Sequence, residues 1–257
     1  MKSRLAVLFV LACGGTAGVL GVPNAYAQEK CTKARLRGSY GHLITGTRFE
    51  PRALVTNVGM AHFDGKGQVV LDVTLALNGK IMSRIGQPDP PRPYTVNEDC
   101  TGIVYRTDGT PTWEIIITND GREILWNFVG GDRSTNGIAQ KQDEKGCTEA
   151  SLEGNYGRLS TGTRFDLGGA LAVNHGTIVF DGKGHYSLPI DTLTIDGVVS
   201  RYTGGSGTYR VNENCSGTIY NEGGAESSDI VIVDGAREIL YVSIEGDRSV
   251  TGVSKRE

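Results

Sequence analysis

The segment CTKARLRGSYG at residues 31–41 recurs as CTEASLEGNYG at residues 147–157. Five further segments recur in the same order: TGTRF at 45–49 and 161–165, FDGKG at 63–67 and 180–184, YTVNEDCTG at 94–102 and YRVNENCSG at 209–217, REIL at 122–125 and 237–240, and GDRS at 131–134 and 246–249. So many ordered matches identify a tandem duplication of a unit of about 110 residues. A unit of that size is large enough to bury its own core.

The duplication predicts two domains, at residues 28–143 and 144–257. The polar stretch KQDEKG at residues 141–146 joins the two copies. Because this junction is short, we expect the two domains to be close neighbours.

The first 27 residues have the features of an export signal. Two basic residues, Lys2 and Arg4, precede the apolar run LAVLFVLA, and the stretch ends in AYA at residues 25–27. This pattern predicts a signal peptide cleaved after Ala27 and an exported protein, periplasmic or secreted. Glycines, a proline and an asparagine interrupt the apolar segment, so no stable membrane insertion is expected after cleavage. The alternative is lipoprotein processing at Cys13.

Four cysteines remain after such cleavage, and each copy carries two of them: Cys31 and Cys100, then Cys147 and Cys215. An even number of cysteines in an exported chain predicts disulfides. The economical pairing joins Cys31 to Cys100 and Cys147 to Cys215. The rival pairing crosses between the copies.

Short strands separated by tight turns fill each copy. Turn dipeptides such as Asp64-Gly65 and Asp181-Gly182 favour hairpins, and the runs between them are rich in β-branched and aromatic residues. Seven or eight strands per copy predict an antiparallel meander that closes into a barrel, because closure removes exposed edges. The one helical candidate in each copy is the turn after its first cysteine, at 34–36 and 150–152. The formal net charge is −3 and no basic cluster stands out, so nucleic acid is not an expected partner.

The recurring framework resembles that of exported bacterial proteins with an allene oxide cyclase-like domain. The shared pattern is Cys-x-x-Ala-x-Leu-x-Gly-x-Tyr-Gly, Phe-Asp-Gly-x-Gly, Asx-Gly followed by Ser-Arg, and Tyr-x-Val-Asn-x-Asx-Cys. The resemblance covers nearly all of residues 31–257 and implies two calycin-like barrels of about eight strands, each with an apolar lumen. Its motifs are turn and framework residues, so it carries over no catalytic residue.

Two acids occupy one equivalent position in otherwise apolar strands, Glu114 in WEIII and Asp229 in SDIVI. An acid on the inner face of a barrel would be desolvated and suited to acid–base chemistry, which makes both candidate catalytic residues. The alternative is an acid on the wet outer face. We expect at least one of the two carboxyls to face its barrel and to contact a ligand or an arginine.

Further residues are shared by the two copies and are candidate ligand contacts. They are Arg84 and Arg201, Tyr40 and Tyr156, and Asn57 and Asn174. Rim or outer-wall positions for the arginines, packing for the tyrosines and turn roles for the asparagines are the alternatives. The four histidines, His42 among them, have no equivalents in the other copy and predict strand or surface positions and no metal site.

Together these patterns predict an exported tandem barrel that binds a small apolar or amphipathic molecule in a barrel lumen, without a cofactor. One alternative is a cofactor-independent cyclase or isomerase. A second alternative is a structural or surface-interaction module whose lumen is filled by side chains. The state of the barrel interior distinguishes the three hypotheses.

Overall fold

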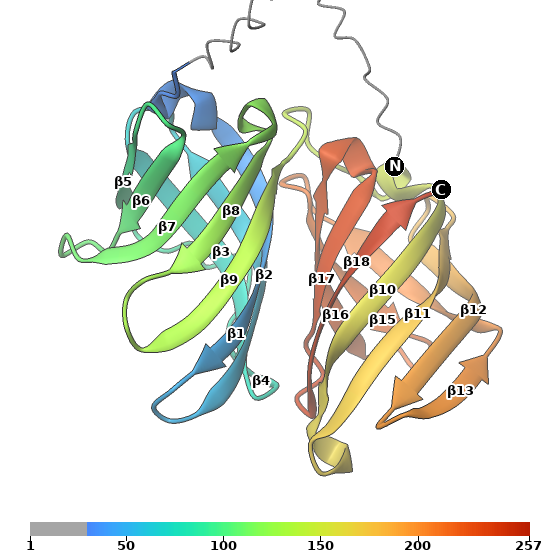
Figure 1. Cartoon of the computed structure of the whole chain (residues 1–257). Coiled ribbons are helices and arrows are strands. Elements are labelled where there is room, and N and C mark those ends of the chain that lie inside the picture. The colour runs from blue at the N-terminus through green and yellow to red at the C-terminus, as the bar shows by residue number, and fades with distance from the viewer. Residues whose placement is uncertain (1–29) are drawn as a thin grey trace, which may run out of the picture.

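The computed structural model describes residues 30–257, so the predicted signal peptide and Cys13 lie outside the described residues. The chain forms two closed antiparallel β-barrels, side by side (Figure 1). Within residues 30–257, no helix has the length and apolarity that crossing a bilayer requires.

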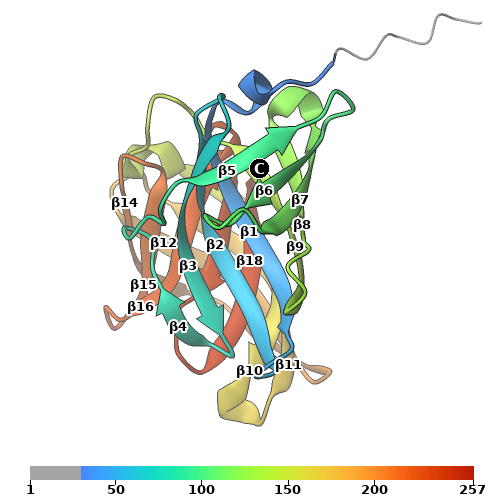
Figure 2. The same cartoon turned by 90° about the vertical axis from the view of Figure 1, so that its left-hand side faces the viewer.

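The first sheet runs in the order β2-β1-β9-β8-β7-β6-β5-β3-β4, and an additional β2–β3 pairing closes eight of these strands into a barrel. Strand β4 extends the β3 hairpin outside the closed ring (Figure 2). The strands are β1 (Gly38–Arg48), β2 (Ala53–Phe63), β3 (Gln68–Leu77), β4 (Lys80–Ser83), β5 (Arg92–Val96), β6 (Thr101–Tyr105), β7 (Pro111–Thr118), β8 (Glu123–Phe128) and β9 (Arg133–Lys141).

The second sheet repeats this order as β11-β10-β18-β17-β16-β15-β14-β12-β13, closed by the pairing of β11 with β12. Its strands are β10 (Gly154–Arg164), β11 (Ala170–Phe180), β12 (His185–Ile195), β13 (Val198–Tyr202), β14 (Gly205–Val211), β15 (Ser216–Asn221), β16 (Glu226–Val233), β17 (Glu238–Ser243) and β18 (Arg248–Arg256). The prediction of an all-β protein with two tandem eight-stranded barrels is confirmed.

Five single turns of 3₁₀-helix complete the fold: η1 (Lys33–Leu36), η2 (Asn119–Gly121), η3 (Glu149–Leu152), η4 (Phe165–Leu167) and η5 (Asp234–Ala236). The turns predicted after Cys31 and Cys147 are η1 and η3. The disulfides join Cys31 to Cys100 and Cys147 to Cys215, as the economical pairing predicts. Each one ties such a turn to its own barrel.

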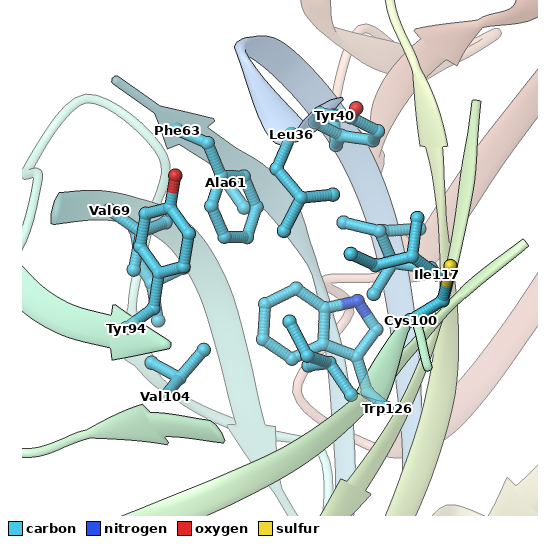
Figure 3. Packing of buried hydrophobic residues seen from close by; sticks show 14 of the residues in the cluster. Leu36, Tyr40, Ala61, Phe63, Val69, Tyr94, Cys100, Val104, Ile117 and Trp126 are labelled. Carbon is cyan, nitrogen blue, oxygen red and sulfur yellow. The ribbon is translucent and has the colours of Figure 1, made fainter. Parts of the chain in front are cut away.

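The same aromatic packing recurs in the core of both barrels. In the first, the Phe63 ring lies edge-on between Tyr40 and Tyr94, with centroids 5.6 and 5.0 Å away (Figure 3). In the second, Phe180 lies between Tyr156 and Tyr209 at 5.5 and 4.9 Å. Edge-to-face contacts at these distances are favourable beyond the apolar area they bury.

A third apolar cluster lies between the two barrels. Val58 and Met60 on the outer face of β2 pack with Val231 on β16 and with Leu240 and Val242 on β17. Four of these side chains, Val58, Val231, Leu240 and Val242, have no exposed surface. The barrels therefore share an apolar interface as well as a covalent link.

Candidate functional site

The lumen of the first barrel holds a cavity of about 420 Å³. Three aromatic side chains line one wall: Trp113, Trp126 and Phe128. Trp113 meets both others edge-on, at 5.9 Å from Trp126 and 5.0 Å from Phe128. Aliphatic side chains line much of the remainder, namely Ile44, Val55, Leu71, Val73 and Leu75. The cavity has the size and apolar wall typical of sites for small molecules.

A neutral polar pair interrupts this apolar wall. The Nε2 atom of His42 lies 2.8 Å from Oδ1 of Asn57, and both residues line the cavity. Burial lowers the pKa of His42 to about 4, although the hydrogen bond to Asn57 opposes the shift. His42 is therefore uncharged at neutral pH. Because Oδ1 of Asn57 can only accept, His42 is the tautomer that carries its proton on Nε2.

Three buried polar atoms in the same lumen have no hydrogen-bond partner among residues 30–257: Nδ1 of His42, Nε1 of Trp126 and Oγ1 of Thr135. All three belong to residues that line the cavity. Buried polar groups are normally paired, and leaving one unpaired costs free energy. The cavity wall therefore contains polar side chains whose hydrogen-bonding capacity is not used within the described chain.

Arginines surround the mouth of this cavity. Arg92 is paired with Asp89 at 2.6 Å, and Arg133 is paired with Asp132 at 2.8 Å and lies 4.7 Å from the centre of the Phe128 ring. Arg106 also lines the cavity, is exposed, and makes no side-chain hydrogen bond or ion pair within the described chain. Asp108 also lies near Arg106, so three arginines and three aspartates balance at the rim, and Arg106 is the arginine without a direct ion pair to a described residue.

The second lumen is smaller and different in character, with a volume of about 210 Å³. Arg158 lines it at the position that His42 has in the first barrel, two residues after the buried tyrosine. Tyr241 takes the place of Trp126, and Ser228 takes the place of Trp113. The second barrel thus lacks the tryptophan wall, and its interior is more polar.

The structure brings the two predicted asparagines to the lumens. Asn57 lines the first cavity. Asn174 is buried and donates from Nδ2 to Oδ1 of Asp191, which lines the second cavity, at 2.8 Å. Neither occupies a turn, since they lie on β2 and β11.

The predicted tyrosines lie in the barrel cores and line neither cavity. Tyr40 donates its hydroxyl to the carbonyl of Gly121, and Tyr156 donates to the carbonyl of Ala236 at 2.7 Å. These bonds fasten η2 and η5 across one end of each barrel. With their hydroxyls engaged there, the tyrosines have a packing role.

The predicted acids and arginines lie outside both lumens. Along β16, Ile230 and Ile232 enter the barrel core, so the alternation of the strand turns Asp229 outward. Glu114 is exposed on the outer wall of β7, and Arg201 is exposed on β13. Asp229 does contact an arginine, but this is Arg84 of the other barrel and the contact lies in the interface. The prediction that a carboxyl faces the lumen of its own barrel is therefore wrong.

Asp229 is almost fully buried in that interface, where it accepts four hydrogen bonds. Arg84 donates from Nη2 to Oδ1 at 2.7 Å and from Nε to Oδ2 at 3.1 Å. Thr74 and Thr218 donate their hydroxyls to it at 2.7 and 3.1 Å. Hydrogen bonding to Asp229 raises the pKa of Arg84 above its ordinary value. The group is thus a structural clamp and has no role in the lumen.

Sequence reasoning missed the residues that define the cavity, His42, Trp113 and Trp126. A signal was present in the alternation of Trp126 and Phe128 along one strand, which places both on one face. Across the described residues, no group of three or more His, Cys, Asp or Glu side chains is arranged to hold a metal ion.

Comparison with known proteins leaves the family unassigned. No family model matches the chain, and no curated protein matches it. Among solved structures, kievitone hydratase from Nectria haematococca is similar with a TM-score of 0.28 and 7% identity, over 94% of this chain and 95% of that one. A protein of unknown function from Nostoc punctiforme has a TM-score of 0.22 and 8% identity, over 89% and 100% of the two chains. These similarities are too distant to carry an argument about function.

Proposed function

We propose that this chain is an exported binding protein that holds a small amphipathic molecule in the lumen of its first barrel. One observation carries the proposal: a cavity of about 420 Å³ combines an aromatic wall with polar side chains and a rim that includes three arginines. An apolar body would pack on Trp113 and Trp126. A polar group would bond near His42, and an acidic group would meet Arg106.

The interior favours binding over the two alternatives. A structural module with a filled lumen would not need a chamber of this size in its first barrel. A cyclase or isomerase built on Glu114 or Asp229 is not supported, because both carboxyls lie outside the lumens. Export is supported by the N-terminal pattern and by the two disulfides, which form in oxidising compartments. The resemblance to allene oxide cyclase-like domains remains a prediction.

Tryptophan fluorescence offers a direct test, because both tryptophans of the chain line this one cavity. We expect the amphipathic anion 8-anilinonaphthalene-1-sulfonate to quench the emission of the native, oxidised protein saturably. Val55 lines the first cavity and Ser228 the second, so Val55→Phe should abolish quenching and Ser228→Phe should preserve it. Equal affinity of the Val55→Phe variant and the unaltered protein would refute lumen binding. As a separate measurement, native mass spectrometry of the purified protein would identify a co-purified molecule.

A further inference from the structure

The two barrels contact each other through different faces. The first barrel contributes the outer wall of β1 and β2 together with Arg84, which we call the docking face. The second contributes the outer wall of β16, β17 and β18 together with Asp229, which we call the receiving face. Such a contact is heterologous, so each barrel also carries an unused copy of the face that its neighbour employs.

The unused docking face lies on β10–β13 of the second barrel, on the side away from the first barrel (Figure 1). Leu159 opposes His175 there, as Leu43 opposes Val58 in the first barrel. Apolar side chains on this wall are open to solvent, Leu159 at 59%, Leu171 at 69% and Ile190 at 60%. A wall that is buried at one copy of a duplicated face and exposed at the other is a candidate interaction site.

The charged group of the docking face is duplicated as well. Arg201 is exposed and opposes Thr192 on the neighbouring strand. In the first barrel, Thr74 lies on β3 and Arg84 directly follows β4, and both bind Asp229. Arg201 has no side-chain hydrogen bond or ion pair within residues 30–257. It is equivalent to an arginine that clamps a carboxylate.

The unused receiving face lies on β7 and β8 of the first barrel. Ile116 opposes Leu125 there, as Val231 opposes Leu240 in the second barrel. Ile116 and Leu125 are 49% and 39% exposed, whereas their equivalents are fully buried in the interface. Glu114 is exposed at the position of Asp229, so it is a carboxylate without its arginine.

A glycine in the docking face gives independent support. A Cβ on Gly41 of β1 would lie 2.4 Å from Val233 and 2.5 Å from Val231, so the absence of a side chain is what lets the barrels approach. Gly157 holds the same position on β10, and no described atom lies within 4 Å of its Cβ position. The second barrel therefore presents the same notch, open to solvent.

We propose that the occupant of this face is a second copy of the chain, docked head to tail. The β10–β13 wall of one copy contacts the β7–β8 wall of the next, and Arg201 pairs with Glu114 as Arg84 pairs with Asp229. A residue of β7 in the next copy enters the notch at Gly157. Repetition of the contact produces closed rings or open chains.

The association is reversible and weaker than the contact within the chain. His175 replaces Val58 on the docking face, and Asn127 replaces Val242 on the receiving face. Both changes introduce polar groups into the centre of the contact. The two copies are also not held together by a covalent link, so their local concentration is lower.

Sedimentation velocity of the oxidised full-length protein, from about 1 μM to about 1 mM, tests the proposal. We expect the average mass to rise with concentration. Arg201→Glu and Glu114→Arg should each weaken association at least about tenfold, because like charges then face each other. The double variant should recover it, and so should an equimolar mixture of the two single variants. Gly157→Val should also weaken association, since it fills the notch.

Arg210→Glu and Glu222→Arg are matched controls at exposed positions outside both faces, and they should leave association unchanged. A protein that stays monomeric over the whole range overturns the proposal and leaves these faces to a partner of another sequence. Association that is insensitive to both charge reversals overturns it too, because another surface must then be responsible.

Discussion

Arg84 of the first barrel donates two hydrogen bonds to Asp229 of the second, at 2.7 and 3.1 Å, across the interface between the barrels. Each residue has an equivalent in the other copy, but the equivalents Arg201 and Glu114 are exposed. One pair of duplicated residues has thus been used to hold the barrels together, and the other pair remains free for intermolecular contact.

This ion pair predicts that neutralising Asp229 lowers the free energy of unfolding more than neutralising its equivalent Glu114. Asp229→Asn should lower the free energy of unfolding by about 1–3 kcal/mol, because it weakens charged hydrogen bonds in a buried setting while Arg84 keeps partial access to water. Glu114→Gln, at the equivalent exposed position, should change it by less than about 0.5 kcal/mol. Urea denaturation of both variants measures the difference. Equal effects would show that Asp229 does not clamp the barrels.

Stability should fall between neutral and mildly acidic pH because of His42. Its folded-state pKa of about 4 lies below the unfolded value of 6.5, so only the unfolded chain takes up a proton between these values. The contribution is fully present above about pH 6.5 and declines as the pH falls to about 4, by roughly 3 kcal/mol in total. Denaturation at pH 7.5 and pH 4.5 should show a smaller decline for His42→Gln than for the unaltered protein. His62→Gln, at an exposed position, should leave the decline as it is.

Each disulfide should stabilise its own barrel. Cys31–Cys100 and Cys147–Cys215 span 69 and 68 residues, and a loop of that length corresponds to roughly 4 kcal/mol in the chain-entropy model. Replacing either pair by serine should lower the free energy of unfolding by a similar amount. Peptide mapping of the unaltered protein should find no free thiol among these four residues. A bridge joining Cys31 to Cys147 would contradict the assigned pairing.

The two halves of the chain should fold separately and then recombine. All pairings of each sheet lie within one copy, so residues 28–143 and 144–257 each contain a complete barrel. Each half alone exposes one side of the apolar interface around Val58 and Leu240, so we expect the halves to form a complex when mixed. Circular dichroism and size-exclusion chromatography follow both steps. Arg84→Glu in the first half should prevent recombination, whereas a half that stays unfolded under oxidising conditions would show that the barrels depend on each other.

Arg106 should select acidic ligands. It lines the cavity mouth without a direct ion pair to a described residue, so Arg106→Glu should weaken binding of 8-anilinonaphthalene-1-sulfonate by about tenfold or more. The uncharged probe N-phenyl-1-naphthylamine should bind the variant and the unaltered protein alike. Because Arg106 is exposed in the loop after β6, the substitution should not alter folding. Parallel loss of both probes would indicate a distorted cavity.

The candidate site was predictable only in part. Asn57 was singled out because both copies retain an asparagine there, and it does line the cavity. His42 lacks an equivalent, so the comparison of the copies could not select it. The comparison did select Asp229 and Arg84, but it could not distinguish a residue kept for the lumen from one kept for the interface. The lumen and the interface are both desolvated, and each favours a charged side chain that is paired.

The sequence by itself determined the duplication and the all-β barrels, and it favoured the disulfide pairing that the structure shows. These features follow from local rules: turn dipeptides set the hairpins, β-branched runs set the strands, and two cysteines per copy leave one pairing within each barrel. Only the tertiary structure decided which side of each strand faces inward and where the barrels touch. A strand has two faces, and the choice between them depends on packing against residues far away in the chain. That packing turns Asp229 toward Arg84 and the tryptophans toward the lumen.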